Sequence, residues 1–194
     1  MLASASSARR KLLADAGIDV ELRQHRVDER ALEAELAPKQ LVPRATAAAL
    51  AEAKARSIAS SVPDAIVIGA DQVLDFEGEV WSKPGSVAAA RDQLARLAGR
   101  SHRLHSAFAV IADGRVMARA VRSARLAVRP LTALEIDLYL DAAGAAVTTT
   151  VGAYQLESHG VRLFERIEGD YFTILGLPLL PLLASLRRLE AIPW

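Results

Sequence analysis

The clearest pattern in the sequence is a continuous apolar run over residues 65–70 that ends in the polar pair Asp71-Gln72. Such a run is typical of a strand that is buried on both faces. We therefore expect a buried strand here, with Asp71 and Gln72 emerging at its C-terminal end. Functional side chains often lie at such positions.

Four longer segments carry the periodicity and the end signals of helices. Residues 43–60 are rich in Ala and place Leu50, Lys54 and Ile58 on one face. A second helix is marked by Thr132 as its cap and Glu135 at the capping-box position. The three expected helices besides residues 43–60 are residues 87–97, 132–142 and 177–189.

The remaining apolar segments predict strands that are joined by short turns. Residues 76–80 contain a hairpin turn, and the Asp113-Gly114 turn joins an antiparallel pair. The expected strands outside the buried run are 102–111, 116–128, 161–167 and a short one around Ile18 and Val20. Because strands and helices interleave irregularly, we expect an α/β fold with a central mixed β-sheet and flanking helices, in a single domain over residues 1–194.

The first residues combine hydroxyl groups and cations at a predicted strand-to-helix junction. Ser6 or Ser7 can cap the helix that follows, and Gly17 can end it. Free backbone N–H groups and the helix dipole favour an anion at such a junction, so residues 4–11 are a candidate phosphate site. The alternative interpretation is an ordinary capped and solvated first turn.

Composition narrows the classes of function. Lys and Arg number 24 against 23 Asp and Glu, and aromatic residues make up 5% of the chain, so nucleic-acid binding is not expected. The absence of Cys excludes thiolate catalysis and disulfides and is compatible with a reducing compartment. We find no signal-peptide or membrane-span pattern, and we expect a cytoplasmic protein with no membrane partner.

Several charged side chains could carry phosphate chemistry. Asp71 and Glu29 each follow a predicted strand, and two such carboxylates suit a hard divalent cation. Lys54 and Lys83 could present point charges to phosphate. Taken singly, each of these residues is more often structural or simply exposed. The histidines show no metal-binding spacing and are expected to be structural or surface groups: His25, His102, His105 and His159.

Several short motifs, in the order given below, are similar to motifs of the Maf family. Together they span nearly the whole chain. The opening Leu2–Arg9 segment, with Leu12-Leu13 and Gly17 after it, is similar to the opening of that family. The later motifs that match are Lys54-Ala55, Gly69-Ala70-Asp71, Lys83-Pro84, Gly152 to Tyr154, Ile167 to Tyr171 and Gly176 to Leu179. The family normally has a few more apolar residues before Leu2, so we expect a short first strand.

The resemblance implies a fold akin to the inosine triphosphate pyrophosphatases, with a cleft between two lobes and frequently a homodimer. It implies an enzyme that hydrolyses the bond between the α- and β-phosphates of a nucleoside triphosphate. By the same resemblance, Asp71 is the general base and shares a divalent cation, Mg²⁺ or Mn²⁺, with Glu29. The residues implied to bind the triphosphate are Ser6, Arg9, Lys54 and Lys83.

Three positions bear on the substrate by the same resemblance: Ala8, Gln72 and Glu157. Members similar to dTTP and UTP pyrophosphatases carry Arg, Thr and Gln there. Members similar to 7-methyl-GTP pyrophosphatases carry Gln and Glu at the last two and lack the Arg, usually having Trp. By this resemblance the chain, with Gln72 and Glu157 and no Arg at Ala8, is most similar to the 7-methyl-GTP subgroup. A physical reason supports it: a carboxylate can accept two hydrogen bonds from the guanine edge, and N7-methylation makes the base cationic.

Two alternatives stay open at this stage. One is a dTTP or UTP pyrophosphatase, and the other is a nucleotide-binding regulator of cell division without turnover. The retained acids Asp71 and Glu29, together with Lys54 and Lys83, favour the enzyme.

Overall fold

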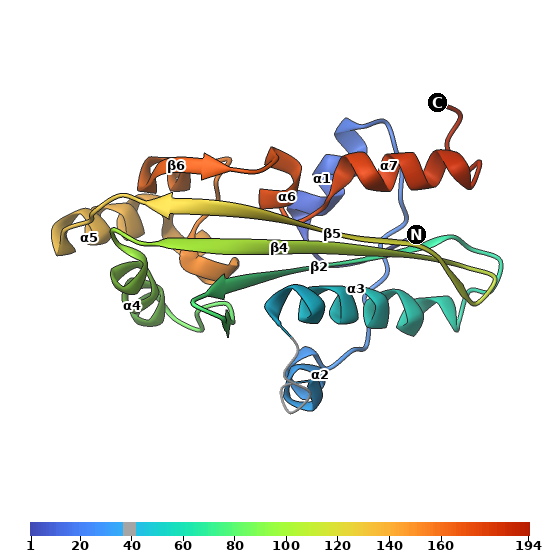
Figure 1. Cartoon of the computed structure of the whole chain (residues 1–194), viewed down its shortest axis with the longest axis horizontal. Helices are drawn as coiled ribbons and strands as arrows, with labels where there is room; N and C mark the ends of the chain where they lie inside the picture. Colours follow the sequence, from blue (N-terminus) through green and yellow to red (C-terminus); the bar gives the residue numbers. More distant parts are fainter. Residues whose placement is uncertain (37–41) are drawn as a thin grey trace. The chain divides into compact units, whose positions relative to one another are not determined.

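The computed structural model describes residues 1–36 and 42–194 of the chain (Figure 1). The chain divides into two compact units. The first consists of Met1–Gln72, His105–Arg122 and Gly176–Trp194, and the second of Val73–Leu104 and Ser123–Leu175.

A six-stranded mixed sheet is the centre of the fold and confirms the predicted α/β class. Strand β1 pairs in parallel with β2, whereas β2 with β3 and β5 with β6 are antiparallel. The order of the main strands is β1 (Leu2–Ala3), β2 (Val67–Phe76), β4 (Ser101–Ala112), β5 (Arg115–Val128) and β6 (Phe164–Glu168), and β3 (Glu79–Trp81) pairs with β2.

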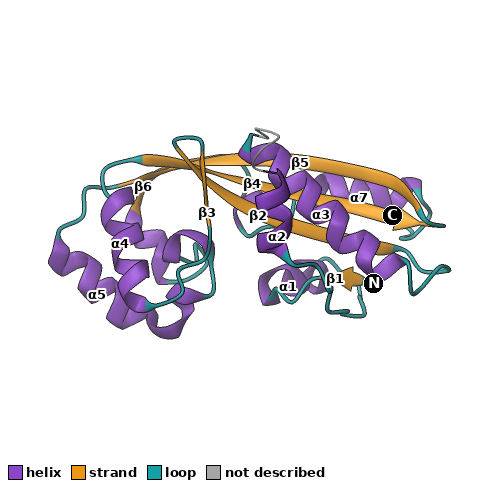
Figure 2. Cartoon of the chain, turned by 90° about the horizontal axis from the view of Figure 1, so that it is seen from below, coloured by secondary structure: helices purple, strands orange, loops and turns teal. Residues whose placement is uncertain are grey.

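In the first unit, helices α3 (Pro43–Ala59) and α7 (Leu179–Arg188) lie on opposite faces of the sheet (Figures 1 and 2). Helix α3 packs very closely on β2 at Gly69. A Cβ atom at Gly69 would lie 2.2 Å from the carbonyl oxygen of Ala51 and 2.6 Å from the nitrogen of Ala55. Only a residue without a side chain permits this contact, which places Lys54 of α3 beside the next residues of β2.

Helix α1 (Ser7–Asp15) begins and ends as predicted. The Ser6 side chain accepts a hydrogen bond from the backbone nitrogen of Arg9, and Gly17 follows the C-cap with a φ of +72°. Helix α2 (Glu29–Leu36) was not predicted. Asp28 caps it, since its Oδ1 accepts a hydrogen bond from the backbone nitrogen of Ala31 at 3.0 Å.

The expected strand around Ile18 and Val20 is wrong. These residues have no strand assignment, and the segment forms only an isolated parallel bridge between Leu2 and Leu22. The physical reason is the length of β1, which spans two residues and offers a neighbour almost nothing to pair with. The prediction of a short first strand is confirmed.

Strand β2 also differs from the prediction, because it continues past Asp71 to Phe76. The continuation carries three apolar side chains, Val73, Leu74 and Phe76, which are almost fully buried, and it forms a hairpin in which Leu74 pairs with Trp81. Asp71 therefore lies in the middle of a strand. Its carboxylate is therefore more buried than it would be at the end of a strand.

The second unit has its own core of aliphatic and aromatic side chains from β2, β3, α4 (Val87–Leu97) and α5 (Ala133–Ala143). The α4 bounds are those predicted, and the capping box of Thr132 and Glu135 is confirmed. Strand β6 begins later than expected because His159–Leu163 forms a 3-10 helix. The other short helices are Gly144–Thr148, Val151–Ala153 and α6 (Tyr171–Ile174).

His102 is a buried histidine in this second core. Its Nε2 lies 2.6 Å from the Tyr154 hydroxyl, and its Nδ1 has no hydrogen-bond partner among the described residues. Burial lowers the pKa of His102 to about 4. The imidazole is therefore neutral at neutral pH, which confirms a structural role.

We expect this histidine to make stability fall with acid. The unfolded chain takes up the proton near pH 6.5 and the folded chain near pH 4, so stability is full above the first value and is lost as pH falls between the two, by up to about 3 kcal/mol. Urea unfolding of wild type and His102→Gln at pH 7 and 4.5 measures this. The wild type should lose more stability than the variant, and equal losses would contradict the prediction. His159→Gln, at an exposed position, is the control.

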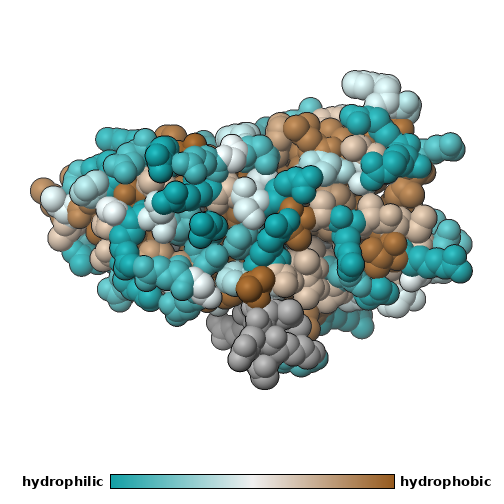
Figure 3. All heavy atoms as spheres, in the orientation of Figure 1, coloured by the Kyte–Doolittle hydropathy of each residue, from teal (hydrophilic) through white to brown (hydrophobic). Residues whose placement is uncertain are grey.

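The last feature of the fold concerns the length of its helices and the character of its surface. Within the described parts of the chain, none of the helices has both the length and the apolar character needed to cross a membrane. On the face in Figure 3, hydrophilic side chains predominate and hydrophobic ones form separate patches. No single apolar surface dominates that face.

Candidate active site

A buried ion pair between Lys54 and Asp71 lies at the centre of the candidate site. The Nζ of Lys54 is 2.5 Å from Oδ1 of Asp71, and the two residues are 4% and 5% exposed. Burial raises the pKa of Asp71, while Lys54 and Arg9 oppose that shift. A buried carboxylate of raised pKa, held beside cations, has the properties of a general base.

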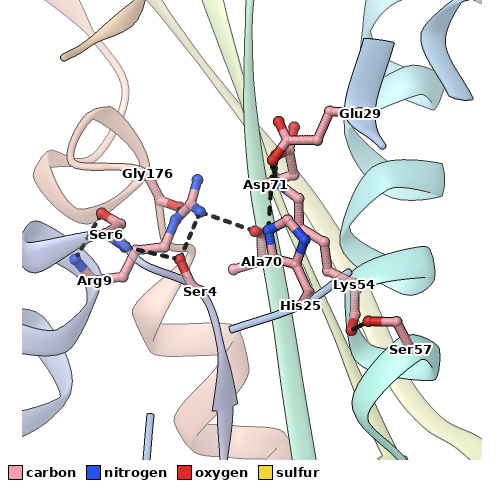
Figure 4. A network of polar contacts seen from close by, with 10 residues as sticks. All are labelled: Ser4, Ser6, Arg9, His25, Glu29, Lys54, Ser57, Ala70, Asp71 and Gly176. Carbon is pink, nitrogen blue, oxygen red and sulfur yellow. Dashed lines mark hydrogen bonds and ion pairs between the residues drawn. The ribbon is translucent and has the colours of Figure 1, made fainter. Parts of the chain in front are cut away.

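Glu29 meets the same lysine from another element. It is the first residue of α2, and its Oε1 lies 2.9 Å from the Nζ of Lys54. Lys54 thus contacts both carboxylates that the sequence identified as candidate metal ligands (Figure 4). The Asp28 cap described above is what starts the helix at Glu29 and so sets the position of this second acid.

Arg9 reaches β2 from the side opposite to Lys54 (Figure 4). Its guanidinium is buried and donates to the carbonyl oxygens of Gly176 and Ala70, at 2.8 and 2.9 Å, and to the Ser4 hydroxyl at 3.2 Å. Burial lowers the pKa of Arg9, whereas Asp71 and Glu29 act in the opposite direction. An arginine keeps its charge at neutral pH even so.

The neutral character of these acceptors matters for phosphate binding. Three hydrogen bonds hold the Arg9 guanidinium in place without cancelling its charge, because each acceptor is a carbonyl or hydroxyl oxygen. Among the described residues Arg9 forms no direct ion pair. Its charge therefore remains available to an anionic ligand at short range.

Ser6 has a defined structural task at the same place. Its Oγ accepts the backbone N–H of Arg9 at 3.3 Å and caps α1, which orients the first turn of the helix. The structure therefore confirms the predicted cap. Direct contact of Ser6 with a ligand stays a prediction.

The three predicted specificity positions are found in different parts of the chain. Gln72 follows Asp71 on β2, and its Nε2 donates to the hydroxyl of the fully buried Ser106 at 3.0 Å. Ala8 is half-buried on α1 in the same unit. Glu157 and the predicted phosphate ligand Lys83 are exposed residues of the second unit, and their roles stay predictions.

His25 belongs to the site, and the sequence analysis did not identify it as a functional residue. Its Nε2 lies 3.5 Å from Oε1 of Glu29, and its side chain is 15% exposed. The only signal in the sequence was its position four residues before Glu29. Ser106 was likewise missed, since nothing in the sequence connects it with Gln72.

The carboxylates fit a hard cation only in part. Asp71 and Glu29 supply oxygen ligands, which Mg²⁺ and Mn²⁺ prefer. Among the described residues, no three His, Cys, Asp or Glu side chains are grouped so that they could hold a metal by themselves. A cation here would take the rest of its ligands from phosphate or water, as Mg²⁺ commonly does.

Fold and site together define an α/β protein whose buried acid is held between two cations, an arrangement suited to phosphate chemistry. Comparison with known proteins agrees with this class. The chain belongs to the Maf family, since the family model described as Maf-like protein matches residues 1–189.

Among similar proteins is one of Rhizobium meliloti named 7-methyl-GTP pyrophosphatase, which is 50% identical over 192 residues, 99% of this chain and 96% of the relative. Another, of Bradyrhizobium diazoefficiens, is named nucleoside triphosphate pyrophosphatase and is 50% identical over 99% of this chain and 94% of its own. The solved structure of the Staphylococcus aureus Ham1 protein matches with a TM-score of 0.40 and 16% identity, over 66% of this chain and 69% of that one.

Proposed function

We propose that this protein hydrolyses nucleoside triphosphates between the α- and β-phosphates, releasing the monophosphate and pyrophosphate. The observation that carries the proposal is the buried Asp71 carboxylate, which is bound to Lys54 and flanked by the fixed charge of Arg9. The names of the relatives at about 50% identity support the same reaction. We treat residues 1–194 as a single Maf-like domain, and pairing of two copies stays a prediction.

The proposed reaction uses these residues as follows. Asp71 takes a proton from a water molecule while the water oxygen attacks the α-phosphorus. The bond from that phosphorus to the α–β bridging oxygen breaks, and pyrophosphate leaves with the electron pair. Lys54, Arg9 and Lys83 would offset the negative charge that develops on the phosphate oxygens. A divalent cation held by Asp71 and Glu29 would supply further charge neutralisation.

We further propose 7-methyl-GTP as the preferred nucleotide. Relatives from Rhizobium meliloti and Mesorhizobium japonicum, 50% and 48% identical, carry the name 7-methyl-GTP pyrophosphatase. In this chain Glu157 would accept hydrogen bonds from the guanine edge, and its charge favours a cationic base. Gln72 agrees with the same subgroup. Ala8 stands where members similar to dTTP and UTP pyrophosphatases have Arg, and it lacks the stacking surface of the Trp that is usual in the 7-methyl-GTP subgroup.

Assays with a panel of nucleotides test both the proposed reaction and the proposed preference for 7-methyl-GTP. We expect pyrophosphate release with Mg²⁺ or Mn²⁺ to be fastest for 7-methyl-GTP among 7-methyl-GTP, GTP, UTP, dTTP and inosine triphosphate. Glu157→Gln should lower the preference for 7-methyl-GTP over UTP about 10-fold or more, because one charged hydrogen bond is lost. Glu165→Gln, at an exposed position of β6, is the control. Absence of pyrophosphate from every nucleotide would refute the reaction, and an unchanged preference in Glu157→Gln would refute only the substrate assignment.

A further inference from the structure

The hydrogen bond between Gln72 and Ser106 connects the candidate site with the next strand of the sheet. Gln72 lies on β2 and Ser106 on β4, and these two strands are neighbours in the sheet (Figure 1). Nε2 of Gln72 donates to Oγ of Ser106 at 3.0 Å. The amide of Gln72 is therefore attached to a strand other than the one that carries Asp71.

The side chain of Gln72 points to the opposite face of β2 from that of Asp71. Successive side chains of a strand alternate between its two faces, and Asp71 meets Lys54 of α3 on one of them. On the other face, a Cβ atom at Gly176 would lie 3.7 Å from Cδ of Gln72 and 3.4 Å from Nε of Arg9. The Gln72 amide and the Arg9 guanidinium therefore lie close to each other across Gly176. A nucleotide whose phosphates bind Arg9 would bring its other groups close to Gln72.

Ser106 is suited to hold this amide and is too buried to contact a ligand itself. It is 0% exposed, and its strand lies inside the sheet between β2 and β5. A Ser hydroxyl is separated from the backbone by one short bond, so its position is well defined. Gln72 is only partly buried, and a Gln side chain has several rotatable bonds whose freedom opposes a fixed position. A buried partner for its amide limits the rotamers that Gln72 can adopt.

We propose that Ser106 is a positioning residue that fixes the Gln72 side chain for recognition of the nucleotide. The inference rests on the proposed role of Gln72 in the preference for 7-methyl-GTP. An amide that is already held in place loses little conformational entropy when a ligand binds, whereas a free amide must be ordered at that moment. Ser106 acts through Gln72 and contributes to the difference in affinity between nucleotides, not to the chemical step.

The test compares the affinities of the full chain for 7-methyl-GTP and UTP analogues with a non-hydrolysable α–β linkage, by isothermal titration. Ser106→Ala should lower the preference for the 7-methyl-GTP analogue about 5-fold, the effect of one ordinary hydrogen bond. Ser106→Thr keeps the hydroxyl and should stay within roughly 2-fold of wild type. Ser185→Ala is the control, because Ser185 is also buried but its hydroxyl donates to the Pro181 carbonyl within α7. It should leave the preference unchanged.

Two further measurements separate positioning from a general effect on packing. In a Gln72→Ala background, Ser106→Ala should cause no further change in preference, because the amide that it holds is gone. The second measurement is nuclear magnetic resonance relaxation of the Gln72 side-chain amide, whose signal is assigned by its absence from Gln72→Ala. Ser106→Ala should make this amide more mobile on the picosecond to nanosecond timescale.

Several results would overturn the proposal. They are an unchanged preference or an unchanged amide mobility in Ser106→Ala, an equal loss of preference in both backgrounds, and a folded Ser106→Thr that behaves as Ser106→Ala does. An unchanged preference in Gln72→Ala would overturn it as well. If the added methyl group prevents Ser106→Thr from folding, the cycle and the relaxation data decide. Binding is measured without turnover, so a chain that binds nucleotides but releases no pyrophosphate would refute only the proposed reaction.

Discussion

Asp71→Asn is expected to lower the turnover of nucleoside triphosphates by a factor of about 10² to 10⁴, while nucleotide binding is retained. The amide keeps the shape of the carboxylate and an acceptor for Lys54, but it cannot take a proton from water. The loss should therefore be in kcat, measured as pyrophosphate release under saturating nucleotide. Binding is followed by isothermal titration with a nucleotide that carries a non-hydrolysable α–β linkage.

Asp75→Asn is the matched control on the same strand. Asp75 accepts the backbone N–H of Gly78 in the hairpin turn at 2.8 Å, a role that Asn can also fill. Turnover of Asp71→Asn within a few-fold of wild type would remove Asp71 from the reaction. The variant also distinguishes an enzyme from a nucleotide sensor, because a sensor without turnover would act in cells almost as wild type does.

Gly69→Ala is expected to have the largest effect on stability. Its Cβ would lie 2.2 Å from the carbonyl oxygen of Ala51, so α3 would have to move away from β2. Backbone atoms of a packed helix cannot yield as a flexible side chain does, and we expect a loss of about 3 kcal/mol, the upper end of the usual range for overpacking, in the free energy of unfolding. Activity should fall as well, because the same helix carries Lys54 to Asp71.

Gly85→Ala is the control for this experiment. Apart from Gly85 itself and its two chain neighbours, no residue has a heavy atom within 4 Å of the position where its Cβ would be, so the free energy of unfolding should change little. Urea unfolding compares both variants with wild type. A Gly69→Ala variant as stable as Gly85→Ala would show that α3 and β2 are not packed as closely as described.

Local pattern predicted most of the helices well. The helix at Val87–Leu97, the Thr132 capping box and the Ser6 cap depend on residues within one or two turns of each other. Segments whose secondary structure depends on pairing with a segment far away in the sequence were predicted less well. Residues 18–20 alternate like a strand but have only a two-residue strand beside them.

The site shows the same division. The resemblance to the Maf family identified the acids and cations, and the structure brings together Arg9, Glu29, Lys54 and Asp71 in the first unit. Pattern alone placed Asp71 at a strand end, because a polar pair after an apolar run is the usual end signal. The hairpin turn expected at residues 76–80 is confirmed, but the end signal at Asp71 was wrong, because β2 continues through the polar pair and its second half pairs with β3.

By itself, the sequence determined the side chains available for chemistry, the local elements that carry them and the family they resemble. Only the tertiary structure decided which of them meet. Lys54 reaches Asp71 because Gly69 lets α3 approach β2, and Arg9 is held by the carbonyl of Gly176, which is 167 residues away in the chain. Such contacts follow from packing and burial across the whole unit, which no short window of sequence contains.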